Sequence, residues 1–183
     1  MRNTWFTSDL HFWHKNVIEF CRRPFATVEE MNQGLIDNWN AMVKPEDEVY
    51  VLGDFGFCGS TELKKITPAL QGKKILVMGN HDWKYKTNRW IEFGFVEATN
   101  TNPSFQGLER LFTLSHFPYK GGGDHMEEER YAEYRVEDRG GYLLHGHVHT
   151  AWKIKGRQIN VGVDVWDYKP VSIDQIEALI SAC

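Results

Sequence analysis

The sequence predicts an α/β fold, and three observations support this. Short apolar runs of the kind that form buried strands end at glycine or at a polar residue: residues 49–52, 75–78 and 141–144. Stretches of helical character separate the first of these runs. The 183 residues are enough to bury one sizeable core, so we expect residues 1–183 to form a single domain. Strands alternating with helices are typical of α/β architecture.

The individual elements follow in chain order. A first strand is expected at residues 4–8, almost at the start of the chain. Two helices are expected at residues 28–43, opened by a capping box of Thr27 and Glu30, and at residues 61–70, with Ser60 as N-cap. The second half contains another buried strand at residues 110–115 and a hairpin at 152–161 that turns at 155–157. These elements favour a layered α/β sandwich with mixed sheets over a doubly wound sheet.

Composition excludes several classes of protein. The 21 Lys and Arg residues against 25 Asp and Glu give a net charge of -4, which disfavours non-specific coating of nucleic acid. No apolar run approaches the roughly 20 residues of a membrane span, so we expect neither a signal peptide nor a membrane partner. Cys21, Cys58 and Cys183 are odd in number and contain no C-x-x-C pair. This pattern suggests no disulfide framework and indicates a cytoplasmic protein.

Polar residues that can bind metal ions follow five of the expected strands. Any one of them alone is more often a turn residue or a structural histidine. Strand ends in an α/β fold converge on one crevice, however, and strand alternation would turn Asp9 and His11 to the same side. We therefore expect a metal site whose ligands come from seven residues: Asp9, His11, Asp54, Asn80, His116, His147 and His149.

Seven donors exceed the three protein ligands of a catalytic zinc and suit two divalent ions that share a carboxylate, for which Asp54 is the natural bridge. Two carboxylates and a bridging hydroxide leave the centre with net positive charge, so the substrate should be an anion. The mixture of imidazole, carboxylate and amide ligands suits transition metals better than calcium or magnesium. We expect manganese first, with iron, zinc, cobalt or nickel as alternatives.

The ordered motifs D-x-H, G-D, G-N-H-D, H and G-H-x-H resemble those of the calcineurin-like metallophosphoesterase family, and they extend from Asp9 to His149. The resemblance implies a four-layer α/β/β/α sandwich with two mixed β-sheets. It also implies two metal sites that share Asp54: one formed by Asp9, His11, Asp54 and His149, the other by Asp54, Asn80, His116 and His147. The Asp-Arg-Gly of the family's protein phosphatases is absent after Gly53, and the motifs are similar to those of small bacterial or phage-type phosphoesterases.

The resemblance implies phosphoester hydrolysis. A hydroxide bridging the two metals would attack phosphorus, and His81 would act as general acid toward the leaving oxygen without binding metal. Asp82 would help to orient His81. No lysine or arginine lies within a ligand motif, which favours diesters of nucleotide type over dianionic monoesters. A phosphomonoesterase acting on a small metabolite or nucleotide stays open, and so does a non-catalytic scaffold of the same fold, which the intact ligand set disfavours.

Residues that could contact substrate are less sharply defined by the sequence. His14 could reach a phosphate oxygen, and Arg22 and Arg23 could clamp an anion, although a helix cap and a solvated turn are the alternatives. Trp83 and Tyr119 could stack on a nucleobase. Further expectations concern the surroundings of the site: His145 lies beside the ligands without being one, Asn160 and Asp164 hold a loop, and residues 118–140 form a lid or a solvated face. A homodimer is compatible with the sequence.

Overall fold

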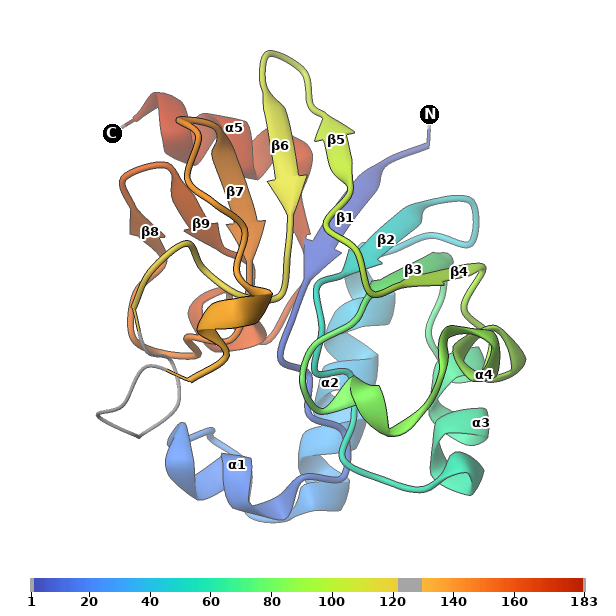
Figure 1. The fold of residues 1–183 in the computed structure, drawn as a ribbon. Helices are drawn as coiled ribbons and strands as arrows, with labels where there is room; N and C mark the ends of the chain where they lie inside the picture. Colours follow the sequence, from blue (N-terminus) through green and yellow to red (C-terminus); the bar gives the residue numbers. More distant parts are fainter. Residues whose placement is uncertain (1, 122–129, 183) are drawn as a thin grey trace.

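The computed structural model describes residues 2–121 and 130–182. It contains two five-stranded sheets (Figure 1), and the predicted α/β fold with two mixed sheets is confirmed. The first sheet has the order β10-β1-β2-β3-β4. Its strands are β1 (Thr4–Thr7), β2 (Glu48–Val51), β3 (Lys73–Val77), β4 (Glu97–Thr99) and β10 (Val171–Ser172). Strands β1 to β4 run parallel, and β10 pairs antiparallel with β1.

The second sheet has the order β5-β6-β7-β9-β8. Its strands are β5 (Ser104–Gln106), β6 (Leu111–Leu114), β7 (Tyr142–His145), β8 (Ile154–Lys155) and β9 (Gln158–Asn160). The three inner strands β6, β7 and β9 run parallel, while β5 and β8 pair antiparallel at the two edges. The predicted hairpin is therefore present as β8 and β9.

Helices pack against both sheets (Figure 1). The α-helices are α1 (Lys15–Phe20), α2 (Val28–Met42), α3 (Ser60–Ala69), α4 (Thr87–Glu92) and α5 (Ile173–Ser181). Short 3₁₀ turns lie at η1 (Asp82–Lys84), η2 (Ala132–Tyr134) and η3 (Val163–Val165). Helices α2 and α3 lie on one side of the first sheet, and α5 packs with strands of both sheets. None of the helices in the described ranges combines the length and the hydropathy that a bilayer crossing requires.

Strand alternation divides the core into two hydrophobic clusters. On β1, Trp5 turns toward the cluster that includes Trp39 of α2, whereas Phe6 turns toward the cluster that includes Phe112 of the second sheet. The buried apolar residues of α2 recur every four positions, which places Met31, Leu35 and Trp39 on one stripe of the helix. The first sheet is thus buried on both faces, as parallel sheets usually are.

The helix caps differ slightly from those predicted. The Thr27 hydroxyl accepts the N–H of Glu30 at 3.1 Å, but the Glu30 carboxylate accepts the N–H of Ala26, at 2.8 Å, instead of that of Thr27. The reciprocal bond of the capping box is therefore displaced by one residue. At α3, Gly59 is the N-cap and Ser60 is the first helical residue.

The loops that leave the parallel strands are tied to one another. The N–H groups of Asp9 and His11 donate to the carbonyls of Gly53 and Asp54 at 3.1 and 3.0 Å, which joins the loops after β1 and β2. A parallel bridge between Ser8 and Gly162 connects the end of β1 to the segment after β9. The ends of strands from both sheets therefore meet at one place in the molecule.

Candidate metal centre

Five of the seven predicted metal ligands have left-handed backbone conformations. The φ angles are 56° at Asp9, 51° at His11, 54° at Asp54, 70° at His147 and 45° at His149. Such angles cost about 1–3 kcal/mol each for residues other than glycine, and they concentrate at functional sites. They also correct our argument from strand alternation, because β1 ends at Thr7 and left-handed turns bring Asp9 and His11 together.

One glycine leaves room for the ligands. A methyl group at Gly146 would overlap the hydroxyl of Ser8 and the carboxylate of Asp9. The backbone of the G-H-x-H segment therefore passes directly against Asp9. This close approach allows the N–H of His147 to donate to both oxygens of the Asp9 carboxylate, at 3.0 and 3.1 Å.

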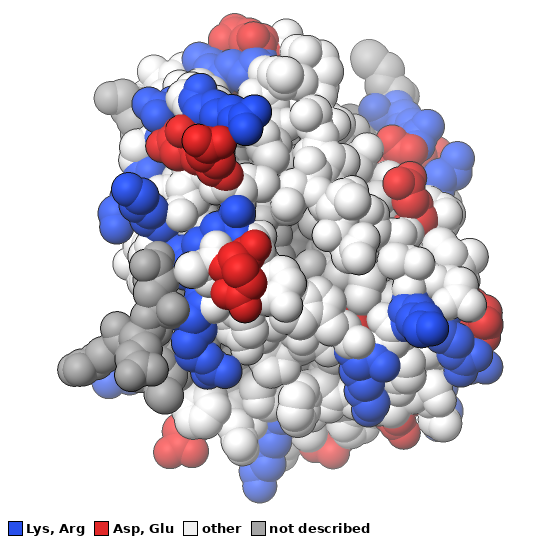
Figure 2. All heavy atoms as spheres, in the orientation of Figure 1, with Lys and Arg blue, Asp and Glu red and all other residues white. Residues whose placement is uncertain are grey.

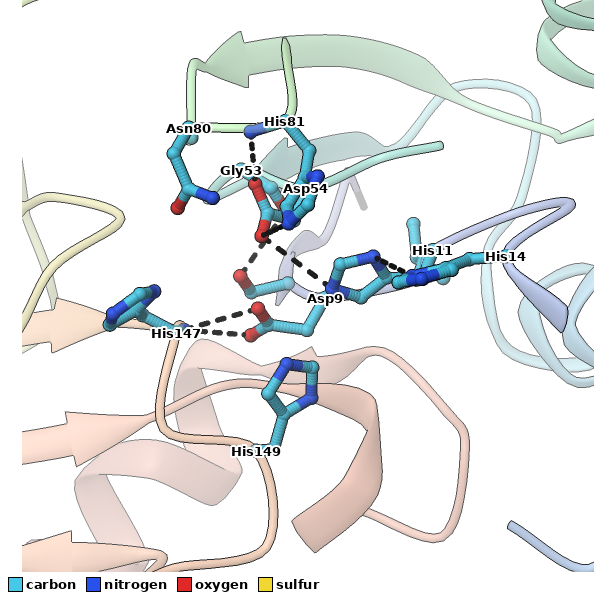
Figure 3. A network of polar contacts seen from close by, with 12 residues as sticks. Asp9, His11, His14, Gly53, Asp54, Asn80, His81, His147 and His149 are labelled. Carbon is cyan, nitrogen blue, oxygen red and sulfur yellow. Dashed lines mark hydrogen bonds and ion pairs between the residues drawn. The ribbon is translucent and has the colours of Figure 1, made fainter. Parts of the chain in front are cut away.

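Asp54 lies at the centre of the site. Its Oδ2 atom is 3.5 Å from Nε2 of His11 and 3.4 Å from Nε2 of His116. In Figure 3, the carboxylates of Asp9 and Asp54 lie between His147 on one side and His11 on the other, with Asn80 and His81 above and His149 below. Asp9 and Asp54 are 0% and 2% exposed, so the two carboxylates face one another out of contact with bulk water.

The first group of potential ligands consists of Asp9, His11 and His149, whose donor atoms lie within 4.8 Å of one another. Nδ1 of His149 is 2.9 Å from Oδ2 of Asp164. The carboxylate accepts a hydrogen bond from the N–H at Nδ1, so Nε2 of His149 is the nitrogen that can present its electron pair to a metal. Asp164 thus holds the ring of His149, in agreement with the expectation that Asp164 fixes its loop.

Another group of potential ligands consists of Asp9, Asp54 and His116, whose donor atoms also lie within 4.8 Å of one another. Nδ1 of His116 is 2.9 Å from the carbonyl oxygen of Leu52, and a carbonyl can only accept, so Nδ1 carries the proton. Nε2 of His116 then faces Oδ1 of Asn80 at 3.1 Å. The ring of His147 lies 5.2 Å from that of His116, centroid to centroid, beside this group.

The chemistry of these donors fits divalent metal ions. Nε2 of His11 is buried and has no hydrogen-bond partner in the described structure, although an unpaired buried polar atom is costly. Burial lowers the pKa of His147 to about 2 and the pKa of His11 well below its ordinary value, which keeps both imidazoles neutral, as metal ligands must be. A metal would satisfy the lone pair of His11 and the two buried carboxylates together.

The ionisation of Asp54 and His116 is coupled. Burial opposes the charge on Asp54, but the imidazoles of His116 and His11 outweigh burial and hold the pKa of Asp54 well below its usual range. Burial by itself would lower the pKa of His116, whereas the carboxylate of Asp54 raises it to about 9. The site is therefore arranged to keep positive charge beside Asp54, a position that a cation can take.

His81 and His14 lie at the rim of the site. The His81 side chain is 32% exposed, its Nε2 is 3.9 Å from Oδ2 of Asp54, and its N–H donates to Oδ1 of Asp54 at 3.0 Å. The Nδ1 atoms of His14 and His11 are 3.1 Å apart, and the His14 ring packs at 4.7 Å on Phe57. Burial lowers the pKa of His14 to about 4. The structure therefore brings both histidines next to the predicted ligands.

Asp82 has a different role from the one that the sequence suggested. It is fully buried, and its Oδ2 accepts the N–H groups of Asp54 and Gly79, both at 2.8 Å, while its Oδ1 accepts that of Phe55 at 3.1 Å. These bonds tie the loop after β3 to the loop after β2. The suggestion that Asp82 orients His81 is corrected, because both carboxylate oxygens are directed to backbone amides that position Asp54.

Arg23 also differs from its predicted role. Its guanidinium pairs with Asp164 at 2.8 Å and donates to the carbonyls of Leu10 and Asp9 at 3.0 and 2.7 Å. The Arg23 side chain is fully buried, so it holds Asp164 and the Asp9 loop together instead of clamping a substrate anion. Arg22, with φ of 52°, is exposed. Sequence reasoning missed the link from Arg23 through Asp164 to His149.

The other residues predicted near the site differ in whether the structure agrees with their predicted roles. Trp83 is 38% exposed and lines a hollow beside His116. Tyr119 is buried, and its hydroxyl donates to the carbonyl of Gly141 at 3.2 Å, which corrects its suggested role in stacking. The His145 ring packs at 4.7 Å on Trp152 and belongs to none of the groups of potential metal ligands among the described residues. The amide of Asn160 donates to the carbonyls of His149 and Trp152, so it holds this loop as predicted. Residues 122–129 of the suggested lid lie outside the described residues.

Comparison with known proteins decides the family. The family model for calcineurin-like phosphoesterases matches residues 2–151. The chain belongs to the calcineurin-like phosphoesterase family. It is 38% identical to the gene 66 protein of Mycobacterium phage L5, over 99% of this chain and 95% of that protein. It is 35% identical to an uncharacterised protein of Methanocaldococcus jannaschii, over 98% and 92% of the two chains.

A solved structure has the same fold. It is the crystal structure of a protein of unknown function from Aquifex aeolicus, which is 32% identical and superposes with a TM-score of 0.76 over 98% of this chain and 100% of that chain. The phage, archaeal and bacterial relatives cover the chain almost end to end. The fold and the family are therefore shown for the whole described arrangement of sheets and helices.

Proposed function

We propose that this protein hydrolyses phosphoesters at a centre of two divalent metal ions. The observation that carries the proposal is the position of Asp54, whose Oδ2 lies between Nε2 of His11 and Nε2 of His116 at 3.5 and 3.4 Å. One ion would be held by Asp9, His11, Asp54 and His149. The other would be held by Asp54, Asn80, His116 and His147, with manganese as the first candidate for both.

Bound divalent ions would supply an activated water and neutralise charge on the phosphoryl oxygens. The remaining tasks belong to side chains of this protein. The carbonyl of Leu52 and the carboxylate of Asp164 hold His116 and His149 in the tautomer that presents Nε2 to the centre. His81 is partly exposed at the rim and is held next to Asp54 through its own N–H, so it can deliver a proton to a leaving oxygen.

We favour phosphodiesters of nucleotide type as substrates. Two hollows flank the centre, one of about 500 Å³ that reaches His116 and one of about 290 Å³ that reaches Asn80 and His81. They could receive the two arms of a diester. A dianionic monoester would gain from a guanidinium at the centre, but Arg23 is occupied by Asp164. Hydrolysis of phosphomonoesters is the alternative.

The test is hydrolysis of bis-p-nitrophenyl phosphate beside p-nitrophenyl phosphate, after removal of metal with a chelator and re-addition of manganese. We expect turnover of the diester that returns with metal in the wild-type protein and is abolished in Asp54→Ala. Turnover of the monoester alone would replace the diesterase proposal by the phosphatase alternative. Absence of metal-dependent turnover of either ester would overturn the proposed function and support a scaffold.

A further inference from the structure

The larger of the two hollows has an aromatic wall. Trp83 and Tyr134 are 38% and 47% exposed, and both line this hollow, so their rings are accessible to a molecule bound in it. Their ring centroids are 4.5 Å apart, and Phe117 lies behind them at 6.1 Å from Trp83 and 6.3 Å from Tyr134. These three rings form a continuous apolar surface inside a hollow of about 500 Å³, a volume typical of small-molecule sites.

The opposite rim of the hollow is polar. Lys86 and Thr87 come from the start of α4, and Asn100, Thr101 and Asn102 come from the loop after β4. The Thr99 hydroxyl accepts the N–H of Thr101 at 3.0 Å, so this loop is held in a defined turn. In the described part of the chain, Lys86 forms no ion pair. The side-chain amides of Asn100 and Asn102 form no hydrogen bond with any described residue. These amides and the Lys86 ammonium group can therefore bind a ligand that carries both donors and acceptors.

The hollow is continuous with the metal centre. His116 lines it, and Phe117 connects its aromatic wall to the ligands, with ring centroids 4.8 Å from His116 and 4.9 Å from His147. The central part of the face shown in Figure 2 is formed mainly by uncharged residues, with acidic and basic groups beside it. A molecule bound at the metals can thus extend past His116 and Phe117 into the hollow.

We propose that this hollow binds the nucleobase of a nucleotide whose phosphate lies at the metal centre, with Trp83 and Tyr134 as the stacking residues and Lys86, Asn100 and Asn102 at the base edge. This inference rests on the proposed function. A planar heteroaromatic ring matches one apolar wall and one polar rim, because its faces stack on aromatic side chains while its edge forms hydrogen bonds. An alkyl chain would leave the polar rim unsatisfied.

Binding of adenosine 5′-monophosphate and of ribose 5-phosphate to the manganese-loaded protein, measured by calorimetry, tests the inference. The two ligands share the phosphate and the sugar phosphate linkage and differ in the base. Base stacking on aromatic side chains predicts about 5- to 150-fold tighter binding of the nucleotide. In Trp83→Ala and in Tyr134→Ala, this advantage should shrink several-fold through weaker binding of the nucleotide. Trp83→Phe keeps a ring and should retain most of the advantage.

Phe20→Ala is the control, because Phe20 is 52% exposed on α1 and lies outside the hollow. It should bind both ligands as the wild-type protein does. Equal affinities of the two ligands in the wild-type protein would overturn the inference, and so would an advantage of the nucleotide that survives in both alanine variants. Calorimetry separates this result from catalysis: a nucleotide advantage without ester turnover contradicts only the proposed function, and turnover without the advantage contradicts only the nucleobase site.

Discussion

Replacement of Asp82 by asparagine should weaken metal binding although Asp82 binds no metal. Asp82 is fully buried, and its carboxylate accepts three backbone N–H groups, those of Asp54 and Gly79 at 2.8 Å and that of Phe55 at 3.1 Å. An asparagine can accept with only one of its two terminal atoms. Its NH₂ group would therefore oppose at least one N–H in Asp82→Asn.

The expected loss of stability in Asp82→Asn follows from these three hydrogen bonds. A hydrogen bond to a charged group contributes about 1.5–3 kcal/mol, and a buried donor left unpaired costs about 1–3 kcal/mol. We expect Asp82→Asn to lower the free energy of unfolding by about 2–4 kcal/mol. The loop that carries Asp54 should also shift, and loss of a group that positions a ligand weakens metal affinity about 10- to 100-fold.

Asp47 provides a matched control. It is also fully buried, and its carboxylate accepts three N–H groups, from Asn3 at 2.8 Å, from the Trp5 indole at 3.0 Å and from Lys44 at 3.0 Å. These partners precede β1 and β2 or lie in β1, away from the strand ends that carry the ligands. Asp47→Asn should therefore lose similar stability in chemical denaturation and keep wild-type manganese affinity in calorimetry. Equal manganese affinities of the two variants would refute the positioning role of Asp82.

Four other predictions concern the site and its supports. His81→Ala should retain manganese affinity while turnover of a methyl phosphodiester falls about 10²- to 10⁴-fold; an unchanged rate would exclude His81 as general acid. Gly146→Ala should abolish manganese binding, measured by calorimetry, because the added methyl group would overlap Ser8 and Asp9. Gly141→Ala should retain manganese binding, because its added methyl group would be 3.9 Å from the Tyr119 hydroxyl. Arg23→Ala should lower the free energy of unfolding by about 3–5 kcal/mol because it removes the guanidinium that pairs with the buried carboxylate of Asp164 and leaves only His149 beside it, and a loss below about 1 kcal/mol would contradict the pairing. Burial lowers the folded-state pKa of His145 to about 3, below its ordinary 6.5. Its contribution to stability is therefore complete above pH 6.5 and is lost as the pH falls toward 3. In the metal-free protein, His145→Phe should reduce the slope of the unfolding free energy against pH by about 1.4 kcal/mol per pH unit in this window.

The clustering of the candidate ligands could be predicted because the information for it is local and ordered. Each candidate ligand lies within four residues of the end of a strand, and parallel strands end at the same edge of a sheet. Asp54, for example, stands two residues beyond a buried run, which is visible in the sequence without knowledge of the fold. The mixed sheets could be predicted for a similar reason, since runs of buried residues and the β8–β9 hairpin have local signatures, whereas the four-layer arrangement was implied by the resemblance to the family.

The supports of the site could not be predicted in this way. Arg23 pairs with Asp164, 141 residues later in the chain, and nothing near either residue indicates the partner. Asp82 was assigned to its sequence neighbour His81, whereas its bonds include the backbone of Asp54, 28 residues earlier. Left-handed conformations at Asp9 and His11 also have no marker in side-chain type, because tertiary contacts impose them. Roles that depend on long-range contacts therefore required the structure.

The most direct test of the dinuclear centre is turnover of bis-p-nitrophenyl phosphate as metal-free protein is titrated with manganese. The account predicts that the rate rises until two equivalents of manganese are bound per chain, and that Asp54→Ala, which removes the shared carboxylate, shows no such rise. Saturation of the rate at one equivalent, or turnover that does not depend on metal, would contradict it.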